Sequence, residues 1–369
     1  MKPNIIFILL DGSRWDRLDI SNEFSELKKE GSIFDNITTT APYTFASVNT
    51  IFTGLYGKDN GVDAYYNMFK LKDSIEFLPE YLQNNGYFTS CNLISEKVIS
   101  KRGFDIHQFH DEYTDNLLEL HPKIIKESLE KAQGKPFFSF LQYSHIHTVT
   151  VSEILKKYDW DSQEFYDQKE ENMKKYDESF IKAGQYAKHI FQTIQDLGIE
   201  KNTILIFFAD HGTGIGERFG ERNYGVFLHE ETIRTFYLFI GPGISKNKNK
   251  STLLSTIDIL PTINELCELP IIEELPGISF GEALKNDTCI KDKEVTFSAT
   301  GGLQGPFPSP NEPNVFCAKT KDHKLIYYKA LDAWYFYDLK NDPNEEENIY
   351  DKENEIQKKL QEKLLFWIR

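Results

Sequence analysis

The chain has 369 residues, of which 40% are hydrophobic and 27% are charged, and its formal net charge is −15 at pH 7. This length allows one large α/β domain with an accessory piece, and the hydrophobic content is enough for a substantial core. Because the negative balance repels polyanions and anionic membranes on average, we expect neither nucleic acid nor a membrane as a partner.

The cysteines and the N-terminal segment indicate in which cellular compartment the protein is located. Four cysteines are scattered without a CxxC pair, which is typical of free thiols in a reducing compartment and not of a disulfide framework or a zinc site. The first apolar run has only six residues before Asp11, too few for the apolar region of a signal peptide or for a membrane span. We therefore expect a cytoplasmic protein without membrane insertion.

Strand and helix patterns alternate along the first 290 residues. Apolar runs too short for an ordinary core helix predict buried strands at residues 5–10, 88–95, 135–147, 204–209 and 236–243. Helical patterns, some closed by a glycine, lie at 24–31, 45–54, 77–87 and 151–197. This alternation predicts the α/β class, with a doubly wound, mostly parallel sheet covered by helices on both faces.

The pattern changes after about residue 290. EVTFSATGG, HKLIYYKA and AWYFYDL are short and alternating, which predicts a small antiparallel sheet, and the chain ends in the amphipathic helix IQKKLQEKLLFWIR. We expect an α/β domain over residues 1–290 and a C-terminal subdomain over 291–369 packed on it. The Gly/Pro-rich stretch 301–313 is either a plain connection or part of the rim of a site.

Acidic and imidazole side chains follow two of the predicted strands. Asp11 ends the first run, and Asp210 and His211 end the run at 204–209. Ligands of open α/β sheets collect at the carboxyl ends of strands, so we expect these side chains to meet at one edge. The mixed oxygen and nitrogen set suits Mn²⁺, Zn²⁺ or a similar divalent ion better than a dedicated Ca²⁺ cage. Taken alone, Asp11-Gly12 is more typical of a turn.

Thr44 and two histidines add groups that could react with or bind a substrate. A metal ion could acidify the Thr44 hydroxyl for attack on phosphorus or sulfur, and the N–H groups of the following turn would face an oxyanion. On its own, Thr44 is more typical of a helix N-cap. His147 could contact the substrate or protonate a leaving group. His145 shares its strand face, and both histidines are equally compatible with a structural role.

Together these segments resemble the sulfatase branch of the alkaline phosphatase superfamily. KPNIIFILLDGSRWDRL resembles the opening strand and metal loop, TTTAPYTFASVNTIFTGLYG the nucleophile segment, FFSFLQYSHIHTV the strand with a substrate-contacting histidine, and ILIFFADHGTGIGERFG the second metal loop. The resemblance covers almost the whole chain in the expected order. It implies Thr44 as the nucleophile, His147 as the substrate-contacting histidine, and one divalent metal ion (Mn, Zn, Ca or Mg) bound by Asp11, Thr44, Asp210 and His211.

The chain departs from the sulfatase pattern at the nucleophile. Sulfatases carry Cys-x-Pro-x-Arg, whose cysteine becomes formylglycine, whereas this chain has Thr44-Phe45-Ala46-Ser47-Val48. A formylglycine hydrate expels sulfate by collapsing to an aldehyde, and a threonine sulfate ester has no such exit. Water or an alcohol can attack a phosphothreonine. The departure therefore favours a hydrolase of phosphate mono- or diesters, or a phosphotransferase acting on a glycan or alcohol acceptor.

Further departures concern the number of metal ions and the charge around the substrate. Gly12 stands where sulfatases often have a second Asp. Tyr224 stands where relatives often have His or Lys, and Arg218 stands where some have His; because His is lost at both of these places, we expect a single metal ion. Arg218 and His229, with His145, are candidates for binding a small anionic ester substrate, although Arg218 equally suits a solvated loop.

Two alternatives to the phosphoesterase reading stay open. One is a sulfatase-like protein that acts on sulfate esters, and the other is a degenerate binding module without catalysis. The charged helical segment 151–180 and the loop 301–313 are the predicted specificity elements, and their composition identifies no ligand.

Overall fold

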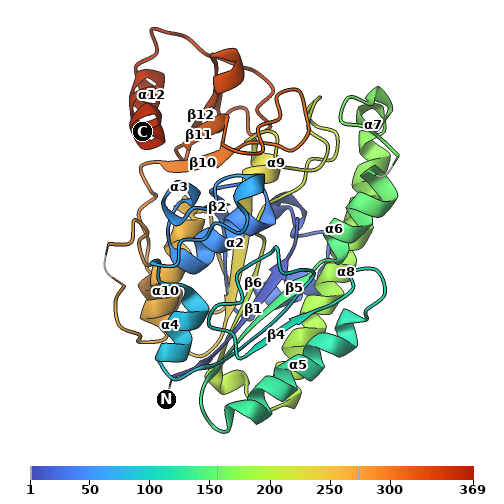
Figure 1. The fold of residues 1–369 in the computed structure, drawn as a ribbon, viewed down its shortest axis with the longest axis vertical. Helices are drawn as coiled ribbons and strands as arrows, with labels where there is room; N and C mark the ends of the chain where they lie inside the picture. The colour runs from blue at the N-terminus through green and yellow to red at the C-terminus, as the bar shows by residue number, and fades with distance from the viewer. Residues whose placement is uncertain (1, 156, 273) are drawn as a thin grey trace.

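The computed structural model describes residues 2–155, 157–272 and 274–369, which form two sheets surrounded by helices (Figure 1). The large sheet has the strand order β4-β3-β5-β1-β6-β7-β2-β8, with β9 paired to β2. Its pairs are parallel except β6–β7 and β2–β7. The expected α/β architecture with a mostly parallel sheet is confirmed.

The strands of the large sheet are short and mostly buried. They are β1 Asn4–Leu10, β2 Ser32–Thr38, β3 Phe88–Leu93, β4 Ile106–Phe109, β5 Phe137–Tyr143, β6 Thr203–Phe208, β7 Arg234–Ile240, β8 Lys248–Lys250 and β9 Leu254–Ser255. The sequence did not predict β2, because its polar residues interrupt the apolar pattern. Tertiary hydrogen bonds satisfy these groups: the Ser32 hydroxyl, for example, donates to the Ser245 carbonyl (2.6 Å).

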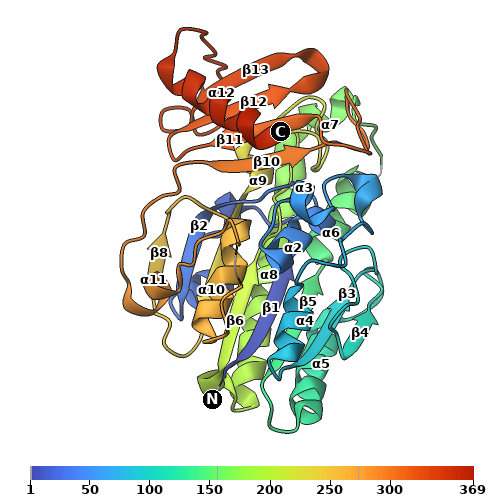
Figure 2. The same cartoon turned by 60° about the vertical axis from the view of Figure 1, so that its left-hand side comes forward.

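Alternation along β1 builds two cores, one on each side of the sheet. Ile6 and Ile8 contact the cluster under α1 (Asn22–Lys28), α5 (Leu117–Ala132) and α8 (Lys169–Asp196). Phe7 and Leu9 contact the opposite cluster, under α2 (Thr44–Thr53), α4 (Leu78–Asn84) and α10 (Ile259–Leu266). Figure 2 shows α2, α4 and α10 in front of the sheet with α8 behind it. Among the helices of the described chain, none is sufficiently long and apolar to span a bilayer.

Two predicted boundaries were wrong. The strand expected over 135–147 ends at Tyr143, and α6 (His145–Val149) begins there. The helix expected throughout 151–197 is interrupted: a π-helical turn covers Thr150–Leu155, α7 covers Gln163–Asp167, and α8 begins at Lys169. Ser162 accepts the Asp159 N–H in the turn before α7 (2.9 Å), so local side-chain bonding competes with the continuous helix.

The C-terminal residues form the expected small antiparallel sheet. Its strands, in spatial order, are β10 Thr296–Thr300, β11 Val315–Lys319, β12 His323–Tyr328 and β13 Ala333–Asp338. The sequence did not predict β11. The final helix α12 (Glu355–Ile368) packs on one face through Leu360 and Leu364, and the other face packs on Leu228 and Ile233 of the α/β domain.

A buried ionic cluster joins this sheet to the α/β domain. Lys324 Nζ lies 2.8 Å from a Glu230 oxygen and 2.9 Å from a Glu345 oxygen. Lys319 Nζ lies 2.9 Å from the other Glu230 oxygen, and all four side chains are buried. Burial raises the pKa of Glu230, but the two lysines more than offset this and lower it to about 2. The carboxylate therefore stabilises the fold above its ordinary pKa, and this contribution is lost as the pH falls toward 2.

Replacing Lys324 with Met should destabilise the fold strongly. The change leaves Glu345 buried without its lysine and Glu230 with one lysine fewer, a loss that typically costs about 3–5 kcal/mol. Urea unfolding at pH 7 measures the effect. Lys329→Met is the matched control, because its ion pair with Glu312 (3.6 Å) is more than half exposed and should cost no more than about 1 kcal/mol. Equal unfolding midpoints for the two variants would contradict this account of the interface.

Candidate active site

Parallel pairing of β1 and β6 brings the predicted metal ligands together. Leu9 pairs with Phe208, so the residues after each strand emerge side by side at the carboxyl edge. One ligand atom from each of Asp11, Asp210 and His211 lies within 4.8 Å of the others, and all three residues are buried.

Thr44 completes the group. Its Oγ1 is 3.4 Å from Asp11 Oδ1 and 3.3 Å from His211 Nε2. The structure therefore brings together the four residues that the sequence predicted as a metal site.

Hydrogen bonds from surrounding groups orient these side chains. Gln142 Nε2 donates to Asp11 Oδ2 (2.7 Å), which directs Oδ1 inward. The backbone N–H of His211 donates to Asp210 Oδ1 (2.9 Å). His211 Nδ1 is 2.7 Å from the Gly212 carbonyl, which can only accept, so the proton belongs on Nδ1 and the Nε2 lone pair faces Asp11 and Thr44. Such outer hydrogen bonds are typical of histidine and carboxylate metal ligands.

The electrostatics of the group fit a divalent cation. Within the described chain, Asp210 Oδ2 is buried and has no hydrogen-bond partner. Burial raises the pKa of Asp210 to about 6; His211 opposes this rise, and the Asp11 carboxylate adds to it. Two buried carboxylates with an orphaned oxygen are costly without a counter-charge. Two carboxylates, an imidazole and a hydroxyl are ligands for Mn²⁺, Zn²⁺ or a similar ion.

Gly12 has a conformational reason to be glycine. Its φ is +70°, and an added Cβ would lie 2.9 Å from Thr213 Oγ1. A side chain here would be strained and crowded, which explains why this position carries glycine.

The start of α2 presents Thr44 and free N–H groups to the same space. Tyr43 is the N-cap and Thr44 the first helical residue, so Thr44 is not the cap that it resembles in isolation. The first N–H groups of a helix have no intrahelical partner and favour anions. The Ser47 hydroxyl donates to the Asp210 carbonyl (2.8 Å), which fixes α2 against the end of β6.

A cavity of about 170 Å³ opens onto these groups. Its lining comprises Asp11, Tyr43, Thr44, Phe45, Tyr65, Ile94, Ser95, Lys97, Val98, His147 and Tyr224. Sequence reasoning missed Lys97, since a lone lysine with no motif around it carries no signal.

His147 lies at this cavity with two partners. Its Nε2 is 2.9 Å from the Tyr224 hydroxyl, and its Nδ1 is 3.9 Å from Glu112 Oε2. Burial lowers the pKa of His147, but Glu112 and Asp11 more than offset this, so its pKa is raised. The sequence pointed to Tyr224 only as a departure, and it gave no reason to select Glu112.

The other three predicted substrate-binding residues lie elsewhere. His145 lines a separate cavity of about 300 Å³, because residues two apart on a helix do not share a face. Arg218 Nε donates to Glu231 Oε1 (3.0 Å), and His229 Nδ1 lies 3.4 Å from Glu345 Oε1. The structure does not bring them to the metal ligands, and their role in binding substrate stays a prediction.

A larger cleft of about 610 Å³ adjoins the cavity, since Tyr65 and Tyr224 line both. Tyr158 and Trp160 come from the predicted specificity segment 151–180, and Gln304 comes from 301–313. Arg222 Nη2 donates to Gln304 Oε1 (3.1 Å).

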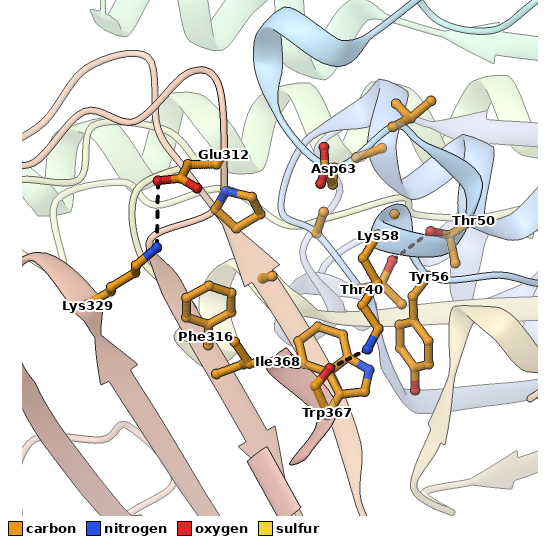
Figure 3. Close-up of a pocket in the computed structure, with 16 residues that line it drawn as sticks. Thr40, Thr50, Tyr56, Lys58, Asp63, Glu312, Phe316, Lys329, Trp367 and Ile368 are labelled. Atoms are coloured by element: carbon orange, nitrogen blue, oxygen red, sulfur yellow. Dashed lines mark hydrogen bonds and ion pairs between the residues drawn. The ribbon is translucent and has the colours of Figure 1, made fainter. Parts of the chain in front are cut away.

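A fourth cavity lies between α2 and the C-terminal subdomain. It has a volume of about 240 Å³ and is lined by Ala46 and Thr50 of α2 together with Phe316 and Trp367 of the C-terminal subdomain. Figure 3 shows Lys58 directed at Trp367 and a pair of opposite charges at the rim. None of the predicted site residues lines this cavity.

Family models account for almost the entire chain. Residues 3–269 match the Sulfatase model, and residues 220–368 match the model of the N-sulphoglucosamine sulphohydrolase C-terminal region. The chain therefore belongs to the sulfatase family.

Named relatives cover parts of the chain. Over 182 residues it is 28% identical to arylsulfatase K of Bos taurus, an alignment covering 47% of this chain and about a third (32%) of the relative. It is 22% identical over 272 residues to the low-salt glycan biosynthesis sulfotransferase Agl7 of Haloferax volcanii, covering 70% of this chain and 59% of the relative. Further relatives from Gallus gallus, Bacteroides thetaiotaomicron and Homo sapiens also carry sulfatase names, which favours the sulfate-ester alternative over the predicted phosphate esters.

Solved structures share the fold. A 2-O GAG sulfatase superposes with a TM-score of 0.82 at 17% identity, covering 100% of this chain and 91% of that one. The phosphonate monoester hydrolase of Agrobacterium radiobacter superposes with a TM-score of 0.74 at 15% identity, covering 99% and 95%.

Removing the His211 imidazole should abolish metal binding. Elemental analysis after dialysis against Mn²⁺ or Zn²⁺ should find about one ion per wild-type chain and none on His211→Ala. Gln142→Leu should weaken affinity about 10–100-fold, because Asp11 loses its orienting donor. Asp19→Asn, a change at an exposed carboxylate, is the matched control. Unchanged metal content in His211→Ala would refute this ligand set.

Proposed function

We propose that the protein is a metal-dependent enzyme that cleaves small anionic esters, with sulfate esters as the first class of substrate. The observation that carries this proposal is the position of the Thr44 hydroxyl, within 3.4 Å of Asp11 and His211. The hydroxyl faces a cavity at the N-terminus of α2. Family membership and the names of the relatives support a sulfate ester.

The residues at the cavity have separable tasks. The first-turn N–H groups of α2, with Lys97 and His147 nearby, hold the anionic head of the ester. Thr44 supplies the oxygen that attacks sulfur, and its hydroxyl lies within reach of the Asp11 carboxylate. A bound divalent cation would supply Lewis-acid stabilisation of the developing negative charge.

The fate of a sulfated Thr44 distinguishes this chain from formylglycine enzymes. A threonine sulfate has no geminal hydroxyl whose collapse would break its carbon–oxygen bond. The sulfuryl group leaves only when a second oxygen attacks sulfur, and that oxygen belongs to water or to an acceptor alcohol. Transfer and hydrolysis therefore share the first half-reaction. The relative named as a sulfotransferase, which matches 70% of this chain, supports an alcohol acceptor.

Phosphate or phosphonate esters form the second candidate class. Thr44 favours them, because a phosphorylated threonine can be attacked at phosphorus. The fold likeness to a phosphonate monoester hydrolase is compatible with this class.

The adjoining cleft supports a sugar as the alcohol part of the ester or as the acceptor. Its volume of about 610 Å³ is more than three times that of the cavity lined by Asp11 and Thr44, and its walls mix apolar with polar surface. Tyr113, Tyr158 and Trp160 offer ring faces, and Arg222 and Gln304 offer hydrogen-bond donors. Apolar walls with a few convergent polar groups are typical of small-molecule sites.

Removing the Thr44 hydroxyl should abolish ester cleavage. We expect wild-type protein loaded with Mn²⁺ or Zn²⁺ to cleave nitrophenyl sulfate faster than nitrophenyl phosphate, phosphonate and phosphodiester. Thr44→Ala should lower kcat at least about 10³-fold, as loss of a nucleophile does, and Thr44→Ser should retain activity. Thr114→Ala, at an exposed threonine, is the matched control.

Donors labelled with ³⁵S or ³²P should identify the group that becomes attached to Thr44. Label from the sulfate donor supports the main proposal, and label from the phosphate donor alone moves the conclusion to the second class. A Thr44→Ala rate equal to that of the wild type on every ester would refute both.

Removing the Trp160 ring should affect sugar esters selectively. Trp160→Ala should raise KM for a sulfated oligosaccharide about tenfold, because the sugar loses a wall of the cleft, while the kcat/KM for nitrophenyl sulfate stays within about twofold. Steady-state kinetics on the two substrates measure the difference. Phe366→Ala, at a highly exposed aromatic residue of α12, is the control. Equal losses on both substrates would show that the cleft does not bind the alcohol part.

A further inference from the structure

Tyr224 is placed between His147 and the metal ligands. Its ring packs on His211 with 4.2 Å between centroids and on the apolar cluster that includes Tyr43 and Ala46. Its hydroxyl is 2.9 Å from His147 Nε2, and the residue lines the cavity. The next residue, Gly225, has a φ of +94°, and an added Cβ would lie 2.7 Å from the Tyr65 hydroxyl. The backbone position after Tyr224 therefore favours glycine.

Glu112 lies on the far side of His147. The Thr148 hydroxyl donates to Glu112 Oε2 (2.6 Å), which fixes the carboxylate 3.9 Å from His147 Nδ1. Within the described residues, Nδ1 is buried and has no hydrogen-bond partner. Among the residues that the structure describes, the charged group paired with Nδ1 is the Glu112 carboxylate, which favours a positively charged imidazole. Glu112 acts through His147 and is a positioning residue.

We infer that Tyr224 delivers a proton from His147 to the leaving-group oxygen of the ester. This inference rests on the ester-cleaving function proposed above. When His147 carries both ring protons, its Nε2–H donates to the Tyr224 oxygen. The Tyr224 O–H is then free to donate to the leaving-group oxygen in the cavity. Tyr224 is thus assigned as a catalytic residue, at a position where sequence comparison showed only a departure.

The transfer balances in one concerted step. The Thr44 hydroxyl gives its proton to water in the cavity, and its oxygen forms a bond to sulfur or phosphorus while the bond to the leaving-group oxygen breaks. The leaving-group oxygen keeps the electron pair of that bond and takes the phenolic proton. The Tyr224 oxygen takes the proton on His147 Nε2, so the phenol is restored and the imidazolium becomes a neutral imidazole. The water or acceptor alcohol that next attacks the group on Thr44 gives its proton to the neutral His147, which restores the imidazolium. The Thr44 oxygen takes a proton from water as its bond to sulfur or phosphorus breaks.

Leaving groups of different basicity test this assignment. A sugar alkoxide is strongly basic and needs a proton as it departs, whereas nitrophenolate does not. Tyr224→Phe keeps the ring and removes only the hydroxyl. We expect it to lower kcat for a sugar ester about 10²–10³-fold and kcat for the nitrophenyl ester less than threefold. Tyr66→Phe makes the same change at an exposed ring and serves as the control.

A double-mutant cycle tests whether Tyr224 and His147 form one unit. The double variant Tyr224→Phe/His147→Gln should be no slower on the sugar ester than the slower single variant. Either substitution alone already interrupts the proton transfer, so the second has nothing further to remove. Multiplicative losses would overturn the relay. Equal loss in Tyr224→Phe on the sugar and nitrophenyl esters would also overturn it.

The failure of the relay is distinguishable from the failure of the proposed function. If metal removal and Thr44→Ala abolish turnover but Tyr224→Phe behaves as the wild type on the sugar ester, only the relay fails. If wild-type protein cleaves no ester, or if its rate depends neither on metal nor on Thr44, the function fails and the relay fails with it.

Discussion

The parallel pairing of β1 with β6 is the constraint on which the site depends. It places Asp11 and Asp210 at adjacent strand ends, in a region where both carboxylates are buried. Two like charges so close together out of water are unfavourable unless something neutralises them. A cation would resolve this conflict, and burial and charge repulsion already raise the pKa of Asp210. Packing of the rest of the fold therefore holds two carboxylates together at a site that favours a positive charge.

The helix α2 positions Thr44 in a different way, because Thr44 lies in the first turn of a helix and not at the end of a strand. Its first turn carries Thr44, while Ser47, one turn later, is hydrogen-bonded to the backbone at Asp210. The Thr44 hydroxyl, the proposed nucleophile, is thus fixed relative to Asp210, a candidate metal ligand, by a hydrogen bond that needs no metal ion. Such preorganisation is what reactions limited by orientation require.

Substitutions that look like losses in the sequence have structural counterparts. Gly12 has a left-handed backbone, and an added Cβ would lie close to Thr213. This position therefore favours glycine over the aspartate of the sulfatase pattern. Tyr224, which the resemblance places where relatives often have His or Lys, contacts both His147 and His211. The site consequently carries hydroxyl groups at Thr44 and Tyr224 where the sulfatase pattern that it resembles has other residues.

The sequence by itself determined the α/β class, the strand ends that carry Asp11 and Asp210, and the grouping of these residues with Thr44 and His211. Periodicity and the rule for strand ends suffice for the strands and for Asp11, Asp210 and His211, because these are local properties. Thr44 joined them only through the resemblance to the sulfatase pattern. It misplaced His145 by extending a strand past Tyr143, and it overlooked β2, whose polar groups find partners only in the folded chain. Only the tertiary structure decided that Glu112, Lys97 and Tyr224 gather at the site. Their positions result from contacts between segments far apart in the chain, for which no sequence period exists.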